Sequence, residues 1–262
     1  MHIPAQDILP QPFDWITIPA GKVKILYDRN WKNLWKPDYR PDKFERTFDV
    51  AGFEIGKYPV TNAQFAKFVD AQGYHQREWW TDAGWKQRQQ GGWTKPLYWH
   101  IPKWNKPDFP VVGVSWYEAS AFCQWLSAAT GENVRLPTEQ EWQHAAQGES
   151  DRDVAWDGVN DEEMRCNWEG FWDTDGTTPV TQFEGKGDSP YGVVDMTGNV
   201  WEWCCNTYET DEANPEGTAI RVAPGGGWVL IYSYEVNIRV TDRMGLSPHH
   251  RLNYLGFRCA WS

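Results

Sequence analysis

The sequence predicts an α+β fold with few helices, short strands and extensive loops. Three helix starts carry capping boxes, in which Ser or Thr is followed three residues later by Glu or Gln. Between them lie short apolar runs, and residues 151–190 are rich in Asp, Gly and Trp without sustained periodicity. With no linker, repeat or low-complexity tract, the 262 residues indicate a single domain over residues 1–262.

Each predicted helix is bounded by its cap and by a glycine. The cap pairs are Thr61 with Gln64, Ser115 with Glu118 and Thr138 with Glu141, and the stops are Gly73, Gly131 and Gly148. Apolar residues at helical spacing follow each cap. Residues 53–60 are predicted as a strand entering the first helix, and 110–114 as a buried run leading into the second. Residues 1–50 carry no motif, and we expect them to pack on the domain.

The composition indicates an ordered protein that does not bind nucleic acid. The 19 tryptophans, 11 tyrosines and 11 phenylalanines are spread along the chain, and disordered chains lack such residues. A net charge of −11 argues against nucleic acid, because phosphate binding needs clustered Lys and Arg. We find no signal peptide, no basic amphipathic helix and no apolar run of about 20 residues. We therefore expect no membrane insertion, with the cytoplasm as the default location.

The cysteines do not indicate a metal site. There are five, an odd number, without a CxxC motif. We expect them to be reduced and buried in the core, because free cysteine behaves as a small hydrophobic residue. They are Cys123, Cys166, Cys204, Cys205 and Cys259.

Seven segments, taken in order, resemble the formylglycine-generating-enzyme (sulfatase-modifying-factor) family over about residues 50–261. They are 54–62 (EIGKYPVTN), 110–119 (PVVGVSWYEA), 135–142 (RLPTEQEW), 191–196 (YGVVDM), 198–203 (GNVWEW), 225–228 (GGGW) and 256–260 (GFRCA). The resemblance implies a C-type-lectin-like fold built from short antiparallel strands. Most of these residues are expected to build the fold, so they identify architecture and not chemistry.

The resemblance also implies where catalysis would lie, and this sequence departs from it there. Active members use two cysteines spaced C-x4-C, between the glycine motif and the terminal GFR, to bind copper and activate oxygen. The corresponding positions here are Glu235 and Val240, and neither side chain can act as a thiolate. We therefore expect no formylglycine-generating activity and require no cofactor.

A metal-dependent oxidoreductase remains the alternative enzyme reading. The iron-dependent sulfoxide-synthase branch takes ligands from a preceding His-rich helical domain, for which this chain has no room and no H-x3-H pair. A two-histidine-one-carboxylate site assembled from separate loops stays open. The adjacent His249 and His250 are predicted as exposed loop residues.

Structural calcium is implied by the resemblance at two places. One is the Asn-x-x-Glu of the GNVWEW motif, which is Asn199 with Glu202. The other is the preceding loop, with Asn167 and Asp175. Oxygen ligands suit this hard cation, and an irregular acidic loop gains order from it. The alternative is that these residues only form turns and solvated acids.

The segment 225–258 resembles the carboxy-terminal segment of the variable proteins of diversity-generating retroelements. In those proteins, adenine-directed mutagenesis rewrites positions between fixed framework residues. The framework residues here are Arg239, Arg243, Pro248, Arg251 and the terminal Gly256, Phe257 and Arg258. Met244 does not arise from an Asn codon by changing adenines alone, so it departs from the pattern.

The resemblance implies a non-catalytic protein that binds an unknown protein or other macromolecule through this segment. Tyrosines and aliphatic residues would act as anchors, and small polar neighbours would tune the fit. The expected ligand-binding residues are Val229, Leu230, Ile231, Tyr232, Tyr234, Asp242, Met244, Gly245, Leu246, Ser247, His250, Leu252, Asn253 and Tyr254. A structural or regulatory interaction domain without diversification is the other alternative.

Overall fold

The computed structural model describes residues 3–33, 38, 40–156, 164–168, 175–210, 212–213, 217–229 and 239–262. Its helices are α1 (Ala5–Ile8), α2 (Asn62–Asp70), α3 (Asp82–Gly91), α4 (Trp116–Thr130) and α5 (Glu139–Gln147), with 3-10 helices η1 (Trp31–Asn33), η2 (Gly73–His75) and η3 (Arg77–Trp79). Its strands are β1 (Trp15–Ile18), β2 (Gly21–Asp28), β3 (Lys43–Val50), β4 (Phe53–Gly56), β5 (Val134–Arg135), β6 (Trp201–Glu202), β7 (Arg221–Pro224), β8 (Arg243–Leu246), β9 (Leu255–Gly256) and β10 (Ala260–Trp261). The fold is the predicted α+β type with short strands.

The three predicted helices form, and each begins with a complete capping box. The caps of α2, α4 and α5 accept a hydrogen bond from the third helical residue, whose side chain bonds back to the cap. Helix α2 ends at Asp70, earlier than the predicted stop at Gly73. Gly73 serves close packing instead, because a Cβ there would lie 2.2 Å from the Phe68 ring.

The carboxy terminus completes the main sheet. Its strand order is β1-β4-β10-β5 with antiparallel pairs, so the last strand lies inside the sheet and binds β4 and β5. The predicted strand 53–60 is shorter, ending at Gly56 as β4. Residues 110–114 are buried as predicted, but they form only an isolated bridge between Pro110 and Thr61. One pair, β6 with β9, is parallel.

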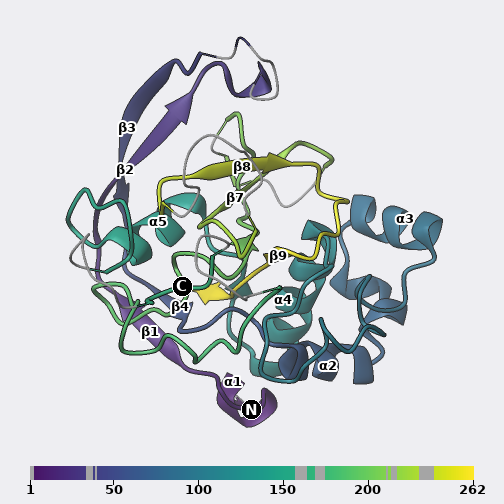
Figure 1. Cartoon of the computed structure of the whole chain (residues 1–262). Helices are drawn as coiled ribbons and strands as arrows, with labels where there is room; N and C mark the ends of the chain where they lie inside the picture. Colours follow the sequence, from purple (N-terminus) through teal and green to yellow (C-terminus); the bar gives the residue numbers. More distant parts are fainter. Residues whose placement is uncertain are drawn as a thin grey trace.

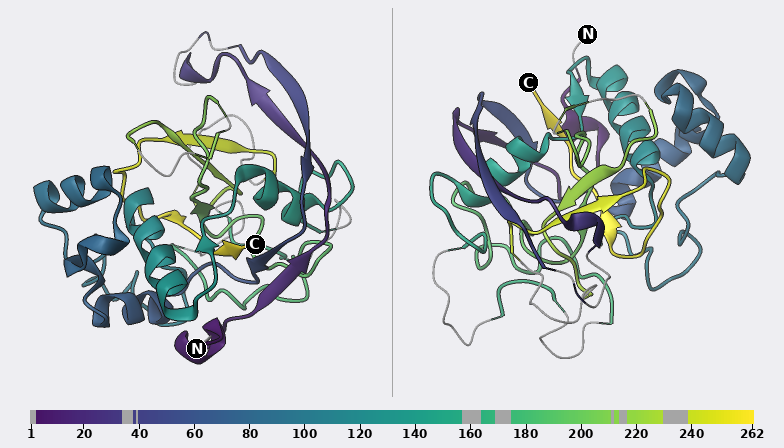
Figure 2. Two further views of the ribbon diagram at one scale, coloured as in Figure 1. Left: turned by 180° about the vertical axis from the view of Figure 1, so that it is seen from behind. Right: turned by 90° about the horizontal axis from the view of Figure 1, so that it is seen from above.

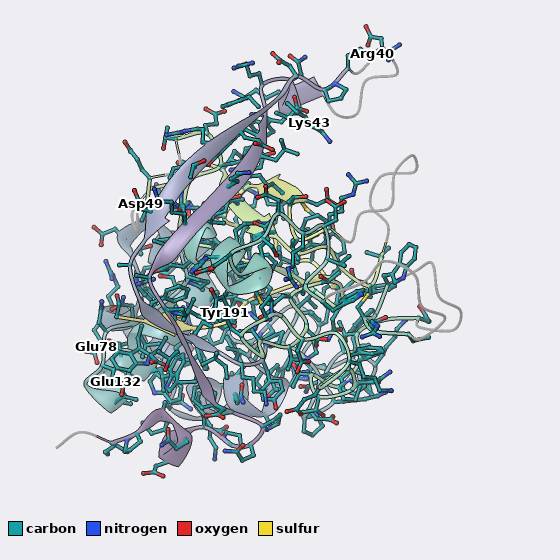
Figure 3. All side chains as sticks on the ribbon, turned by 90° about the vertical axis from the view of Figure 1, so that its left-hand side faces the viewer. Arg40, Lys43, Asp49, Glu78, Glu132 and Tyr191 are labelled. Atoms are coloured by element: carbon teal, nitrogen blue, oxygen red, sulfur yellow. The ribbon has the colours of Figure 1, made fainter. Side chains whose placement is uncertain are left out.

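The first 50 residues form a feature that the sequence analysis missed. Strands β2 and β3 pair along their full length as an antiparallel ribbon that arches away from the body (Figure 1). Val23, Ile25 and Tyr27 alternate on its inner face and are buried. The other face is charged, and Figure 3 shows Lys43 and Asp49 along the ribbon.

The core is divided between the two sides of the molecule. Helices α2, α3 and α4 gather on one side, while α5 and the ribbon lie on the other (Figure 2). Aromatic rings hold the first side together: the Phe122 ring stacks on Phe65 at 5.4 Å and meets Phe257 edge-on at 5.5 Å. Strands β7 and β8 pair between these sides and carry the carboxy-terminal segment over the core.

The five cysteines are free thiols, and four of them are buried as predicted, with Cys205 half-buried. Burial raises the pKa of both Cys166 and Cys205 to about 12, so these thiols stay protonated at neutral pH. The described parts of the predicted loop 151–190 contain neither helix nor strand.

Candidate functional site

The segment after β8 is held to the scaffold through its main chain. Four of its carbonyl oxygens accept hydrogen bonds from outside the segment, and none of these bonds needs a particular side chain on it. They are Pro248 O from Trp116 N (3.0 Å), Leu252 O from Gly113 N (2.8 Å), Asn253 O from Trp228 Nε1 (3.1 Å) and Tyr254 O from Trp201 N (2.9 Å). The path of residues 248–254 is therefore fixed largely independently of its side chains.

The framework arginine at the start of β8 is locked in place by a buried ion pair. Arg243 donates from Nη2 to Oε2 of Glu139 at 2.7 Å and from Nε to Oε1. Its guanidinium also lies 4.2 Å from the ring centroid of Tyr27 and 4.5 Å from that of Tyr208. Burial opposes the charge, but Glu139 raises the pKa of Arg243, so the cation persists. The ribbon is thereby tied to β8.

A second framework arginine anchors the middle of the segment. Arg251 Nη2 donates to Oε1 of Glu118 at 3.0 Å, and its Nε lies 3.0 Å from Oε2 and donates to Gly113 O at 3.2 Å; the guanidinium lies over the Trp93 ring at 4.8 Å. Glu118 is also the capping-box residue of α4. Burial raises the pKa of Glu118 and Arg251 opposes that shift, so the arginine stabilises the charged carboxylate.

Six of the predicted face residues remain half-exposed on this fixed path. They are Leu246, Ser247, His250, Leu252, Asn253 and Tyr254. Val229 and Asp242 are also half-exposed, and His249 is exposed. Leu230, Ile231, Tyr232 and Tyr234 lie outside the described residues, as does Glu235.

One predicted face residue was wrong. Met244 is only 5% exposed and belongs to the main core, opposite Ala223 on β7. Gly245 is half-buried, and a Cβ there would lie 3.0 Å from the Tyr208 ring. Strand β8 therefore contributes core packing at Met244.

In the predicted calcium pair of Asn199 and Glu202, the glutamate already has a cationic partner within the protein. Glu202 is fully buried and accepts bonds from Arg258 at 2.6 and 2.7 Å and from Trp142 Nε1 at 2.8 Å. Its charge is balanced by Arg258, which leaves no reason for a second cation there. In the other predicted site, Asp175 is 90% exposed and pairs with Lys103, so it is a solvated acid.

A different set of oxygen atoms fits calcium better. The Asn199 amide bonds to Asn167, Thr178 and Asp195. In the described part of the chain, Asn167 Oδ1, Thr178 Oγ1 and Asp195 Oδ1 are buried without a hydrogen-bond partner. Burial raises the pKa of Asp195 to about 7. Unpartnered buried oxygens suit a hard cation, so calcium stays a prediction, with Asp195 as the anionic ligand in place of Glu202.

A shallow hollow of about 540 Å³ lies elsewhere and is not part of this face. Its lining includes Glu78, Trp79, Gly131 and Glu132; Figure 3 labels Glu78 and Glu132. Gly131 caps the carboxyl end of α4, whereas the face contacts the amino end, and a helix of this length is about 22 Å long. The hollow therefore lies at the opposite end of α4 from the face.

The scaffold side of the site includes residues that sequence reasoning did not assign. Trp93, Trp228 and Gly113 hold the segment, and Glu118 and Glu139 hold its arginines. In the sequence, Glu118 is recognisable only as a capping-box residue and Glu139 only as the first residue of a predicted helix. Their partners lie more than 100 residues away in sequence, so no local pattern links them.

Comparison with known proteins decides the family. Residues 4–262 match the sulfatase-modifying factor enzyme 1-like domain family. The chain belongs to this family. Among described residues, no helix has the length and hydrophobicity needed to traverse a membrane.

Relatives in this family include both active and inactive proteins. The chain is 33% identical to the inactive C-alpha-formylglycine-generating enzyme 2 of Mus musculus, covering 83% of this chain and 77% of the relative. It is 32% identical to the formylglycine-generating enzyme of Thermomonospora curvata, with 94% and 92% covered. It is 32% identical to hercynine oxygenase of Mycobacterium tuberculosis, with 81% of this chain covered, but spans only 53% of that relative.

Solved structures confirm the fold expected for the sulfatase-modifying-factor family. Treponema denticola variable protein 1 matches with a TM-score of 0.63 at 22% identity, covering 95% of each chain. PvdO from Pseudomonas aeruginosa matches with a TM-score of 0.67 at 23% identity, covering 95% of this chain and 94% of that one. At these identities the likeness concerns the fold.

Proposed function

We propose that this chain is a non-catalytic ligand-binding protein with a diversified carboxy-terminal surface. We call this surface the variable face and define it as Leu246, Ser247, His250, Leu252, Asn253 and Tyr254. Val229 and Asp242 lie in the same segment as secondary candidates. The ligand is a protein or another macromolecule.

The proposal depends on one observation: within residues 246–254, one set of groups binds the scaffold and another set stays partly exposed. Main-chain carbonyls and the largely enclosed Arg251 bind the scaffold, while the intervening side chains stay partly exposed, with Leu246, Leu252 and Tyr254 also touching the main core. Such a segment can change side chains without losing its path. Leu252 and Tyr254 supply large, partly exposed anchors, and Ser247 and Asn253 supply adaptable polar contacts, as in antibody paratopes.

Sequencing of a natural population tests diversification directly. Codons 225–258 would be read deeply across the source population. We expect substitutions at adenine positions between the codons for Trp228 and Gly256, with Arg243 and Arg251 unchanged. Substitutions spread evenly over framework and face codons would contradict the proposal.

The absence of catalysis is tested separately, because relatives of both kinds exist. The family resemblance implies that Glu235 and Val240 stand at the positions of the catalytic cysteines, and Val240 is fully buried. We expect copper-loaded protein to form no formylglycine from a cysteine peptide, measured by mass spectrometry. Stoichiometric iron or copper in anaerobically purified protein, together with oxygen consumption, would favour the oxidoreductase alternative.

A further inference from the structure

Two large aliphatic side chains stand out on the surface beside the variable face. Leu97 is 53% exposed and Ile101 is 44% exposed. In the described part of the chain, the only other large hydrophobic residue that is comparably exposed is Ile3, near the amino terminus, at 43%. Single exposed apolar residues are ordinary, whereas two on one short segment indicate a contact surface.

The backbone forces these two side chains outward. Two overlapping turns, closed by Trp99 N to Pro96 O (3.1 Å) and Ile101 N to Tyr98 O (2.9 Å), carry both residues. Tryptophans of the same segment already fill the space toward the core: Trp104 is 8% exposed, and Trp99 packs against the core residue Phe65. Neither Leu97 nor Ile101 has a place in the core to occupy.

Asparagine side chains also hold this segment through hydrogen bonds to its carbonyl oxygens. Asn105 Nδ2 donates to Trp99 O at 2.8 Å, and Asn62 Nδ2 donates to Trp104 O at 3.1 Å. Asn62 is the first residue of α2, so the turns are bound to a helix. A surface that is ordered before binding loses little conformational entropy when a partner docks.

A single glycine joins these turns to the variable face. Gly113 O accepts a hydrogen bond from Leu97 N at 2.9 Å, and Gly113 N donates to Leu252 O at 2.8 Å. Arg251 also donates to Gly113 O. Leu97 and the variable-face residue Leu252 therefore flank one shared residue, and a partner large enough to cover one reaches the other.

The local charge differs in sign from that of the whole protein. Residues 93–109 contain three lysines, Lys95, Lys103 and Lys106, and one acid, Asp108; because Lys103 also pairs with Asp175, the local excess is one positive charge in a chain of −11. The exposed His100 lies between Leu97 and Ile101. A basic rim around apolar anchors complements an apolar surface rimmed by carboxylates.

We propose that Leu97 and Ile101 form a constant docking surface, outside the diversified segment, for a protein partner with an apolar centre and an acidic rim. We call it the anchor surface. The proposal rests on the proposed function, since it assigns the partner class of the same binding region. Constant anchors supply a baseline contact, and the variable face then adjusts specificity.

The test uses a phage-displayed library of random linear peptides selected on the full-length protein. We expect enriched peptides to combine Leu, Ile, Phe or Trp with Asp or Glu. The double variant L97S/I101S should lower the affinity of a recovered synthetic peptide about tenfold, equivalent to about 1.4 kcal/mol. The matched control I3S removes an equally exposed side chain and should leave the affinity unchanged.

Further variants separate this inference from the proposed function. If the face variant L252S/Y254S weakens binding and L97S/I101S does not, the anchor surface is wrong and the variable face stands. If only L97S/I101S weakens binding, the anchor surface stands without the face. Enrichment of basic peptides, or no enrichment, overturns the inference, as does self-association of the wild type in sedimentation that L97S/I101S abolishes. Circular dichroism melting confirms that every variant is folded.

Discussion

At the residue scale, the position of Gly113 between Tyr98 and Leu252 requires a residue without a Cβ. Its φ is +73°, and a Cβ there would lie 2.6 Å from the Tyr98 ring. Both the conformation and the space therefore favour glycine. The sequence contains Gly113 within a recognisable motif, but neither contact was readable from it, because Tyr98 and Leu252 approach from opposite directions along the chain.

Substitution of Gly113 by Ala should be strongly destabilising. Gly92 is the matched control, because its φ is +60° and nothing lies within 4 Å of an added Cβ. We expect G92A to cost about 1–2 kcal/mol for the left-handed backbone and G113A to cost more, since the Tyr98 clash adds to it. Urea unfolding measures both. Equal costs would show that Tyr98 moves away freely.

At the element scale, predictability follows the range of the interaction. Helices α2, α4 and α5 were predicted because their capping boxes are local. Helix α3 was missed although Thr81 caps it, because Gly84 stands where a capping box has Glu or Gln. The β2–β3 ribbon was not predicted, although Val23, Ile25 and Tyr27 recur at every second position, which is the period of a strand. Burial of Met244 was not predicted, because it depends on pairing with β7, which no local pattern specifies.

The buried pair of Glu202 and Arg258 joins β6 to the last strands and should dominate stability there. Both side chains are fully buried, and Arg258 also donates to three backbone carbonyls. Glu202→Gln removes the carboxylate that is hydrogen-bonded to this buried guanidinium, so we expect a loss of about 3–5 kcal/mol. In the exposed pair Lys22–Asp49, Lys22→Ala should cost less than about 1 kcal/mol. Similar losses in chemical denaturation would refute the assignment.

At the scale of the whole molecule, the variable segment is fixed at both ends. Before it, β8 pairs with β7 and Arg243 binds Glu139; after it, β9 pairs with β6 and β10 enters the main sheet. Between these ends the segment is held by main-chain carbonyls and Arg251, and Leu246, Leu252 and Tyr254 pack partly against the main core. Under the proposed function, this arrangement would let side chains of the binding surface change while the domain keeps one structure.

Calcium, if it binds the oxygen atoms around Asn199, should stabilise the whole domain. At a free concentration of about 100 times Kd, a ligand specific for the native state adds about 2.7 kcal/mol, or roughly 5–10 °C in Tm for a chain of this size. We expect EGTA to lower Tm in the wild type and in Asp175→Asn, but not in Asp195→Asn. A chelator response that is unchanged in Asp195→Asn would exclude this site.

The central claim is that the scaffold, and not the variable side chains, holds residues 246–254. A combinatorial library at Leu246, Ser247, His250, Leu252, Asn253 and Tyr254, displayed on yeast and read by protease resistance, tests it most directly. We predict that most members resist protease as well as the wild type, whereas a matched library at the buried Met244, Leu255 and Phe257 loses resistance. Loss of resistance in most members of the first library would contradict the account.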